Sequence, residues 1–277
     1  MKKVGFIDYY LDEWHANNYP EKIHNASNGR FEVAYAYGMI DSPKGGLTSK
    51  EWAEKYNVQL LDTIEEVIEK SDVLIVLSPD NPEMHEELAD LPLQSGKLVY
   101  IDKTFAPDKE TAIRIFEKAD KHGTKCFSSS ALRYASELKN IDKSKISRLY
   151  SEGPENFDVY AIHQLEMIVM LMESRPLRVM GLGDMVHPSI IIEFEDGRFA
   201  QMYQCMEKKF RLTLADEKNM ETECHIKSSY FDLFMEALVE FFDTGILPLE
   251  HEQTIDVIAI RAAGIKALET PFTWVEV

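Results

Sequence analysis

The sequence predicts an α/β domain with a doubly wound parallel sheet, followed by an α+β domain with an open, mainly antiparallel sheet. In the first 130 residues, short apolar runs alternate with helix-like patterns, as in chains that form a parallel sheet with helices on both faces. After residue 131 the chain instead shows one long apolar helix pattern, a hairpin signal and two closing amphipathic helices. We therefore expect two domains, residues 1–130 and 131–277.

Five apolar runs predict the strands of the first domain. The clearest covers residues 72–77, a continuous β-branched run of the kind expected from a strand buried on both faces. The other four runs are shorter and cover residues 4–7, 31–37, 98–101 and 125–128.

Helical patterns lie between these strands. Residues 63–70 carry apolar side chains at helical spacing. Residues 108–122 predict a helix more strongly, because Asp108 can cap its start and Gly123 can end it. Between these two ends the apolar side chains fall on one face of the helix.

The second domain begins with a polar, basic connection at residues 140–148, and residues 158–174 then predict a long apolar helix. Asp196-Gly197 separates two strand-like runs and is the strongest short hairpin signal in the chain. The last two helices are predicted from apolar stripes within residues 231–242 and 255–262.

The charge and cysteine content exclude several classes of protein. The formal charge of −18 disfavours a nucleic-acid or anionic-membrane surface, because those partners require clustered Lys and Arg. Three scattered cysteines are too few for a disulfide framework or a thiolate zinc site, and they fit a reducing, cytoplasmic compartment. The histidines show no metal-ligand spacing, so no metal is expected.

No targeting or membrane-spanning segment is expected either. The opening apolar run breaks at Asp8, before it reaches the length of a signal peptide. The most apolar later stretch, residues 162–172, carries His163, Gln164 and Glu166, which do not suit a bilayer.

Four pieces of sequence follow one another in an order typical of a known family. A buried strand ends in Ser78-Pro79 and is followed by His85. A second strand ends in Asp102-Lys103-Thr104, the helix at residues 108–121 comes next, and Leu132-Arg133-Tyr134 opens the second half. These pieces resemble the Thr-Pro-Asn-x-x-His turn, the Glu-Lys-Pro strand end and the Asn-x-Arg-Phe segment of the Gfo/Idh/MocA family. The resemblance covers most of the chain and is weak over residues 208–230.

The resemblance implies a Rossmann-like nucleotide-binding domain, then a domain for substrate binding and oligomerisation. It also implies NAD or NADP as cofactor, and hydride transfer to or from a sugar, polyol or related hydroxy or carbonyl compound. Carried over position by position, the family pattern makes Lys103 and His163 the catalytic residues. The predicted cofactor-binding residues are Ser78, Pro79, His85, Asp102 and Lys103, and the predicted substrate-binding residues are Arg133, Tyr134 and Glu166.

The chemistry of these side chains agrees with those roles. Oxidation of an alcohol needs a base for the hydroxyl proton. A lysine at the end of a parallel strand lies where such sheets bind ligands, and partial burial can lower its pKa. Histidine already titrates near neutrality, and Glu166, three residues after His163, can share its helix face. The alternatives are a surface lysine that ends a strand and a histidine packed in a helix interface. The acid that the family usually carries four residues before the histidine is replaced here by Val159.

The dinucleotide fingerprint is absent. A Rossmann protein has Gly-x-Gly-x-x-Gly after its first strand, so that backbone can approach the pyrophosphate. Here residues 8–15 read Asp-Tyr-Tyr-Leu-Asp-Glu-Trp-His, which places bulky side chains and three acids at that turn. A second hypothesis therefore stays open: a non-catalytic binding or partner protein, or an enzyme of another kind, that keeps the fold and has lost dinucleotide binding.

The expected partners are a small-molecule substrate and further copies of the chain. The segment around Met202, Tyr203 and Met206 is predicted to lie on an exposed face of the second sheet. In the Gfo/Idh/MocA family that face often pairs subunits, so the resemblance implies a homo-oligomer formed through the C-terminal sheet.

Overall fold

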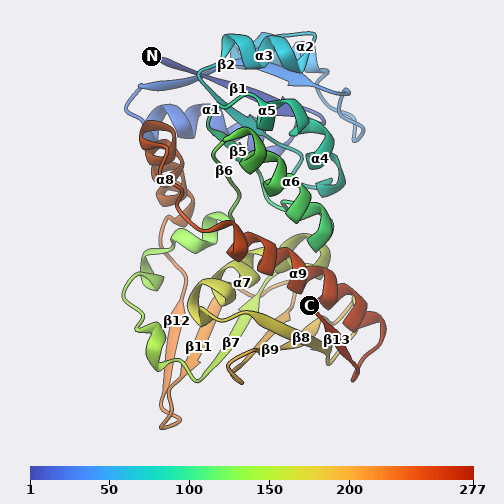
Figure 1. Cartoon of the computed structure of the whole chain (residues 1–277), viewed down its shortest axis with the longest axis vertical. Coiled ribbons are helices and arrows are strands. Elements are labelled where there is room, and N and C mark those ends of the chain that lie inside the picture. Colours follow the sequence, from blue (N-terminus) through green and yellow to red (C-terminus); the bar gives the residue numbers. More distant parts are fainter. The chain divides into compact units, whose positions relative to one another are not determined.

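The computed structural model describes every residue, Met1–Val277, and the chain divides into two compact units. The first consists of Met1–Ser128 and Phe234–His251, and the second of Ser129–Leu233 and Glu252–Val277. The predicted fold class is confirmed, because the first unit holds one parallel sheet and the second a mainly antiparallel sheet (Figure 1). No helix of the chain combines the length and the apolar character needed to span a bilayer.

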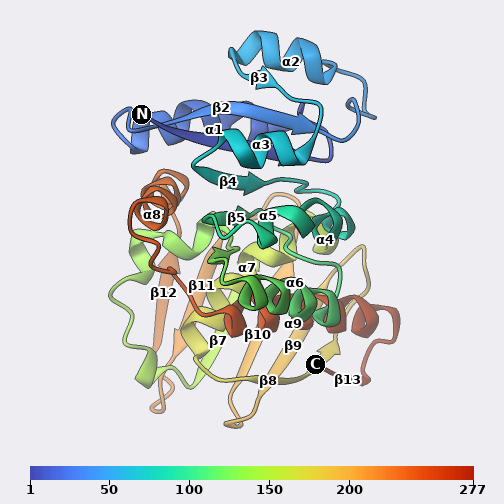
Figure 2. The same ribbon diagram turned by 45° about the horizontal axis from the view of Figure 1, so that its top comes forward.

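The first sheet has six strands in the order β3-β2-β1-β4-β5-β6, and all its pairs are parallel (Figures 1 and 2). This is the strand order of a doubly wound Rossmann sheet. All five predicted strands are present to within two residues at each end, and the short strand β3 was not predicted. The strands are β1 (Lys2–Asp8), β2 (Phe31–Gly38), β3 (Gln59–Leu60), β4 (Val73–Val76), β5 (Val99–Ile101) and β6 (Cys126–Phe127).

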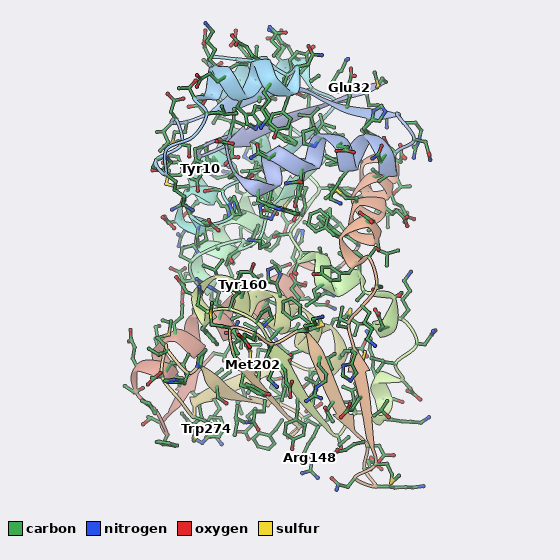
Figure 3. All side chains as sticks on the ribbon, turned by 180° about the vertical axis from the view of Figure 1, so that it is seen from behind. Tyr10, Glu32, Arg148, Tyr160, Met202 and Trp274 are labelled. Carbon is green, nitrogen blue, oxygen red and sulfur yellow. The ribbon has the colours of Figure 1, made fainter.

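Helices cover both faces of this sheet, with α1 and α8 on one face and α3, α5 and α6 on the other (Figures 1 and 3). The predicted caps of α6 are present: Asp108 accepts from Thr111 N, and Gly123 ends the helix with a φ of 65°. The start of α3 is capped by Thr63, which accepts from Glu66 N. The helices are α1 (Trp14–Ala26), α2 (Ser49–Tyr56), α3 (Ile64–Lys70), α4 (His85–Leu88), α5 (Asp90–Gln94), α6 (Lys109–His122) and α8 (Tyr230–Thr244), with a 3₁₀ turn at Pro82–Met84.

The aromatic stripe of α8 explains why residues 234–251 belong to the first unit. The Phe234 ring lies 5.4 Å from the ring of Tyr100 and 6.5 Å from that of Tyr19. Just after the end of α8, the Gly245 carbonyl oxygen accepts a hydrogen bond from Lys125 Nζ at 2.8 Å. Burial of such rings stabilises the packing by about 1.5–3 kcal/mol per side chain.

The second sheet has seven strands in the order β12-β11-β7-β10-β9-β8-β13, with one parallel pair, β7 and β10. The hairpin predicted at Asp196-Gly197 is confirmed, since β9 and β10 pair antiparallel and Gly197 takes a φ of 81°. The strands are β7 (Arg148–Gly153), β8 (Pro176–Gly181), β9 (Ser189–Phe194), β10 (Phe199–Gln204), β11 (Arg211–Ala215), β12 (Glu221–His225) and β13 (Trp274–Glu276).

Two long helices, α7 (Phe157–Met172) and α9 (His251–Glu269), cover one face of the second sheet (Figure 1). The packing is close: a Cβ on Gly181 of β8 would lie 2.2 Å from the Ala267 carbonyl oxygen of α9. Three short 3₁₀ turns precede β7, at Ala131–Tyr134, Ser136–Leu138 and Lys143–Lys145.

The other face of the second sheet carries no helix (Figure 3). Cross-strand pairing places a mixed apolar and polar row along it, made of Trp274, Met180, Ile191, Gln201, Tyr150 and Thr213. The prediction that Met202 lies on the exposed face is wrong, because alternation in β10 turns its side chain to the covered side, where it is 1% exposed. Met206, after the strand, is exposed. The predicted homo-oligomer through this sheet stays a prediction.

Candidate active site

Lys103 lies directly after β5, at the carboxyl edge of the first sheet. Its residue is only 9% exposed, and its ammonium group has no hydrogen-bond or ion-pair partner in the chain. The charge of Lys103 also acts on the carboxyl group of Asp80. Burial raises the pKa of Asp80, but Lys44 forms a hydrogen bond with it at 2.9 Å. Together the charges of Lys44 and Lys103 and this hydrogen bond bring the pKa below its usual value. A half-enclosed amine of this kind can hold or release a proton at a ligand.

Two other predicted cofactor-binding residues, Asp102 and His85, are fully buried. Asp102 is completely buried, and its Oδ1 accepts hydrogen bonds from the hydroxyl of Tyr100 at 2.9 Å and that of Tyr19 at 3.1 Å. His85, at the start of α4, is also completely buried, with Nδ1 at 3.1 Å from Phe105 O. These contacts fix the segment that carries Lys103, and the predicted cofactor contacts of Asp102 and His85 stay predictions.

His85 gives the stability of the chain a specific pH dependence. Burial lowers its pKa from 6.5 to about 4, against the opposing charge of Asp102. Below pH 6.5 the unfolded chain binds a proton at this imidazole that the folded chain does not, so the unfolding free energy should fall by about 3 kcal/mol from this group between pH 7 and pH 4.

Urea unfolding of the wild type and of His85→Gln at pH 7, 5.5 and 4 checks this expectation. The variant should lose about 3 kcal/mol less than the wild type over that range. Carboxylates that titrate in the same window affect both proteins equally. Parallel stability curves would show that His85 is not the buried neutral group described here.

Ser78 and Pro79 follow β4 at the same edge of the sheet. Ser78 has a φ of 144°, which a residue with a side chain rarely adopts, and its Oγ donates to Asn81 O at 3.0 Å. Strained backbone of this kind gathers at ligand-binding sites. Both residues stay predicted cofactor contacts.

The turn between β1 and α1 holds side chains where a dinucleotide needs backbone. Asp8 ends the strand, Tyr10 lies in the turn and Glu13 is the N-cap of α1, so these three have the spacing of the three fingerprint glycines. Tyr10 and Leu11 are buried in the turn, and the Leu11 side chain packs against Gly38 at the end of β2.

The acids of this region are also engaged or buried. Burial, and then the charge of Glu13, raises the pKa of Asp8 well above its usual value, although the amides of Tyr9 and Tyr10 act in the opposite direction. Asp41, the acid nearest to the end of β2, accepts a hydrogen bond from Ser49 N at 2.7 Å. The Asp41 carboxylate therefore stabilises the start of α2 and is not positioned as a free acceptor for a ribose hydroxyl.

A pyrophosphate does not fit this turn as it stands. The first N–H groups of α1 already donate to the Glu13 carboxylate, and side chains occupy the space that the glycine fingerprint would open.

In the second unit, the structure places His163 on the partly exposed side of α7. Its Nδ1 lies 2.6 Å from Ser130 Oγ, and its ring stands edge to face against the rings of Tyr160 at 5.3 Å and Phe210 at 5.9 Å. Ser130 Oγ also accepts from Leu132 N at 3.2 Å, which fixes the hydroxyl. His163 is thus oriented by a serine that the sequence reasoning did not single out.

Glu166 and Arg133 form a buried ion pair next to this serine. Glu166 Oε2 accepts from Arg133 Nε at 2.7 Å, and its Oε1 accepts from Ser130 N at 3.1 Å. Arg133 Nη1 donates to Gln253 Oε1 at 2.7 Å, whereas Nη2 is buried without a hydrogen-bond partner. Glu166 therefore reaches His163 through Ser130, whose amide it accepts from and whose hydroxyl lies against the imidazole.

The remaining predicted substrate contact, Tyr134, is buried in the 3₁₀ turn that also carries Arg133, and burial raises its pKa above the usual value. Two functional candidates, Ser130 and Gln253, could not be found from local patterns, because their importance comes from contacts distant in sequence. Glu13 offered a signal, since an acid at the start of a helix favours capping.

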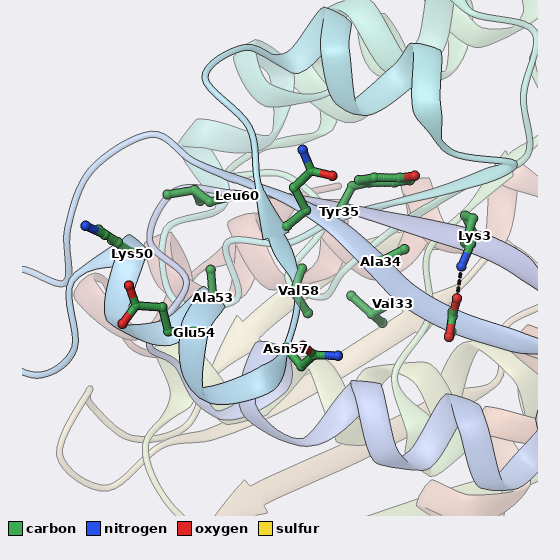
Figure 4. Close-up of a pocket in the computed structure, with 12 residues that line it drawn as sticks. Lys3, Val33, Ala34, Tyr35, Lys50, Ala53, Glu54, Asn57, Val58 and Leu60 are labelled. Carbon is green, nitrogen blue, oxygen red and sulfur yellow. Dashed lines mark hydrogen bonds and ion pairs between the residues drawn. The ribbon is translucent and has the colours of Figure 1, made fainter.

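A depression at the outer edge of the first sheet lies apart from these residue clusters. It has a volume of about 730 Å³ and is lined by β2, β3 and α2, with the Lys3–Glu32 ion pair at one side (Figure 4). None of the predicted site residues lines it. No cluster of His, Cys, Asp and Glu in the chain has a geometry able to hold a metal ion.

Comparison with known proteins finds a family match over part of the chain, largely within the first unit. Residues 21–130 match the model of the Gfo/Idh/MocA family, described as an oxidoreductase family with an NAD-binding Rossmann fold. The resemblance predicted from the motifs is thereby confirmed. The match begins inside α1 and leaves out β1 and the altered turn. No curated protein matches the sequence significantly.

Solved structures share the fold over the whole chain. Scyllo-inositol dehydrogenase from Lactobacillus casei aligns with a TM-score of 0.77 and 13% identity over 100% of this chain and 98% of its own. UDP-N-acetylglucosamine 3-dehydrogenase from Acidithiobacillus ferrooxidans gives 0.76 and 14%, covering 97% and 98%. GenD2 from gentamicin A biosynthesis, in complex with NAD, gives 0.74 and 12%, covering 100% and 97%. At these identities the likeness shows the fold alone.

Proposed function

We propose that this chain, which matches the Gfo/Idh/MocA oxidoreductase family over residues 21–130, transfers hydride between NAD or NADP and a sugar, polyol or related hydroxy or carbonyl compound. The family match and the dehydrogenases that share its fold support this reaction class. A nicotinamide supplies or takes the hydride in such enzymes. The proton that accompanies it needs a group supplied by the protein.

The observation that carries the proposal is the setting of His163. The ring lies on the accessible side of α7, where Ser130 holds Nδ1 at 2.6 Å and the buried Glu166–Arg133 pair holds Ser130. Such support on a rigid helix is what a proton-transferring imidazole requires.

Lys103 is proposed as the second proton-transferring group. Its amine is mostly buried and is not neutralised by an ion pair, which suits a group that contacts a substrate hydroxyl. Arg133, with one buried N–H group unpartnered, and Tyr134 are proposed substrate-binding residues beside His163.

A second candidate is favoured by one observation, the Glu13 cap on α1. If that carboxylate never leaves, the chain is a binding or partner protein, or an enzyme of another kind, that keeps the fold without dinucleotide binding.

Titration of the purified chain with NADH and with NADPH separates the two candidates. The first expects saturable binding of at least one of them at or below millimolar concentration, seen as a change in nicotinamide fluorescence and as a rise in melting temperature. AMP serves as the control, since it shares the adenosine but lacks the nicotinamide. Absence of any response to either dinucleotide at millimolar concentration would remove the dehydrogenase and leave the second candidate.

A further inference from the structure

The start of α1 is saturated by a carboxylate of the chain itself. Glu13 Oε2 accepts from His15 N at 2.7 Å, and Oε1 accepts from Ala16 N. The Glu13 carbonyl accepts from Asn17 N at 2.9 Å. In dinucleotide-binding Rossmann folds, N–H groups at this place bind the pyrophosphate. Here an anion covalently attached to the chain takes them.

The Glu13 carboxylate also contacts the ring of His15. His15 Nδ1 lies 3.0 Å from Glu13 Oε2, and His15 Nε2 lies 3.7 Å from Asp102 Oδ2. The Glu13 side chain is only 7% exposed. One imidazole thus stands between two carboxylates and keeps Glu13 directed at the helix.

The turn that carries Glu13 is fixed to its surroundings. Asp12 Oδ2 accepts from Leu47 N at 2.8 Å, and Oδ1 accepts from Asn17 Nδ2 at 3.0 Å. The backbone of Asp8 and Tyr9 accepts from Met39 N and Ile40 N, each at 2.9 Å. This turn is therefore a built alternative to the glycine fingerprint, with its own hydrogen bonds in place of those that a ligand would make.

We propose that Glu13 is a specificity-determining residue that occupies the pyrophosphate position with its own carboxylate, so that a diphosphate group binds only when Glu13 withdraws. The inference rests on the proposed function for its ligand, since it concerns the dinucleotide site of the same protein. It goes beyond that function because it assigns control of diphosphate binding to one side chain. The like charge of the two anions makes their occupancy mutually exclusive.

Isothermal titration with inorganic pyrophosphate, at about 0.1 M ionic strength, tests this directly on the full chain. Glu13→Gln keeps the length of the side chain and removes its charge, and Glu13→Ser provides a short neutral N-cap. Both variants should bind pyrophosphate at least about tenfold more tightly than the wild type, and NADH and NADPH should follow in the same direction. Because serine is a preferred N-cap, Glu13→Ser keeps α1 formed even if Glu13→Gln does not fold.

Glu51→Gln is the matched control. Glu51 is also an acid at a helix start in the first unit, where it completes the capping box of α2 with Thr48. Its replacement should leave pyrophosphate binding unchanged.

Pyrophosphate affinity in the folded Glu13→Ser variant within twofold of the wild type would overturn the proposal, as would an equal gain in Glu51→Gln. The proposed function fails separately. If the Glu13 variants gain pyrophosphate binding while the wild type binds no dinucleotide, the proposed role of Glu13 is supported and the proposed oxidoreductase activity is excluded.

Discussion

Replacing Lys103 by methionine should lower kcat by about 10²- to 10⁴-fold, the range that a proton-transferring group contributes. Lys103 lies two residues after the end of β5, at the carboxyl edge of the sheet, where parallel sheets bind ligands; it is 9% exposed and its ammonium group has no partner within the chain. Methionine keeps the apolar stem of lysine, so the packing around Asp102 and Thr104 should persist. The measurement is steady-state turnover over a panel of sugars and polyols with NAD⁺ and NADP⁺, with the melting temperature of each protein alongside.

Lys118→Met provides the control for this substitution. Lys118 belongs to the same unit but lies on α6, where it forms a partly exposed ion pair with Asp90. Its loss removes one positive charge without touching the sheet edge, and turnover should stay within about twofold of the wild type. Unchanged turnover in Lys103→Met itself would exclude Lys103 from proton transfer.

The parts of the fold that were predictable are those with strong local signals. The run predicted at residues 72–77 forms β4 (Val73–Val76), because a β-branched run buried on both faces has few alternatives. Helix α6 begins and ends next to the residues that cap it. The α1 helix was not predicted: its turn lacks the expected glycines, and Pro20 lies inside it. Its buried residues Ala16, Tyr19 and Ile23 do have helical spacing.

The return of α8 to the first unit could not be predicted from local pattern. The stripe of Phe234, Leu238, Phe241 and Phe242 predicts an apolar helix face but not the surface that buries it. That surface consists of rings far away in the sequence, such as Phe31, whose ring lies 5.9 Å from that of Phe242.

The candidate site was predictable by residue type, but its internal contacts were not. The motif order pointed to His163, Arg133 and Glu166, and these three do gather in the second unit. Which groups pair depends on side-chain directions that spacing does not give. Glu166 turns to Arg133 and to the backbone of Ser130, while His163 turns to the Ser130 hydroxyl.

Replacing Glu166 by alanine should lower the unfolding free energy by about 3–5 kcal/mol, because it leaves the Arg133 guanidinium buried without its counter-charge. The two side chains are 2% and 7% exposed, so water cannot easily solvate the remaining charge. Arg133 Nη2 already lacks a partner, and Ser130 N would lose its acceptor as well. Urea unfolding at pH 7 measures the change.

The double variant Glu166→Leu/Arg133→Met distinguishes a lone buried charge from a loss of packing. Without any charge at the pair, it should recover most of the stability lost in Glu166→Ala. Its Ser130 would nevertheless lack the carboxylate that holds its amide, so the ring of His163 should be less fixed and turnover should stay low. A Glu166→Ala variant within about 1 kcal/mol of the wild type would mean that water reaches Arg133. In that case the Glu166–Arg133 pair would not be rigid enough to orient the imidazole of His163 through Ser130.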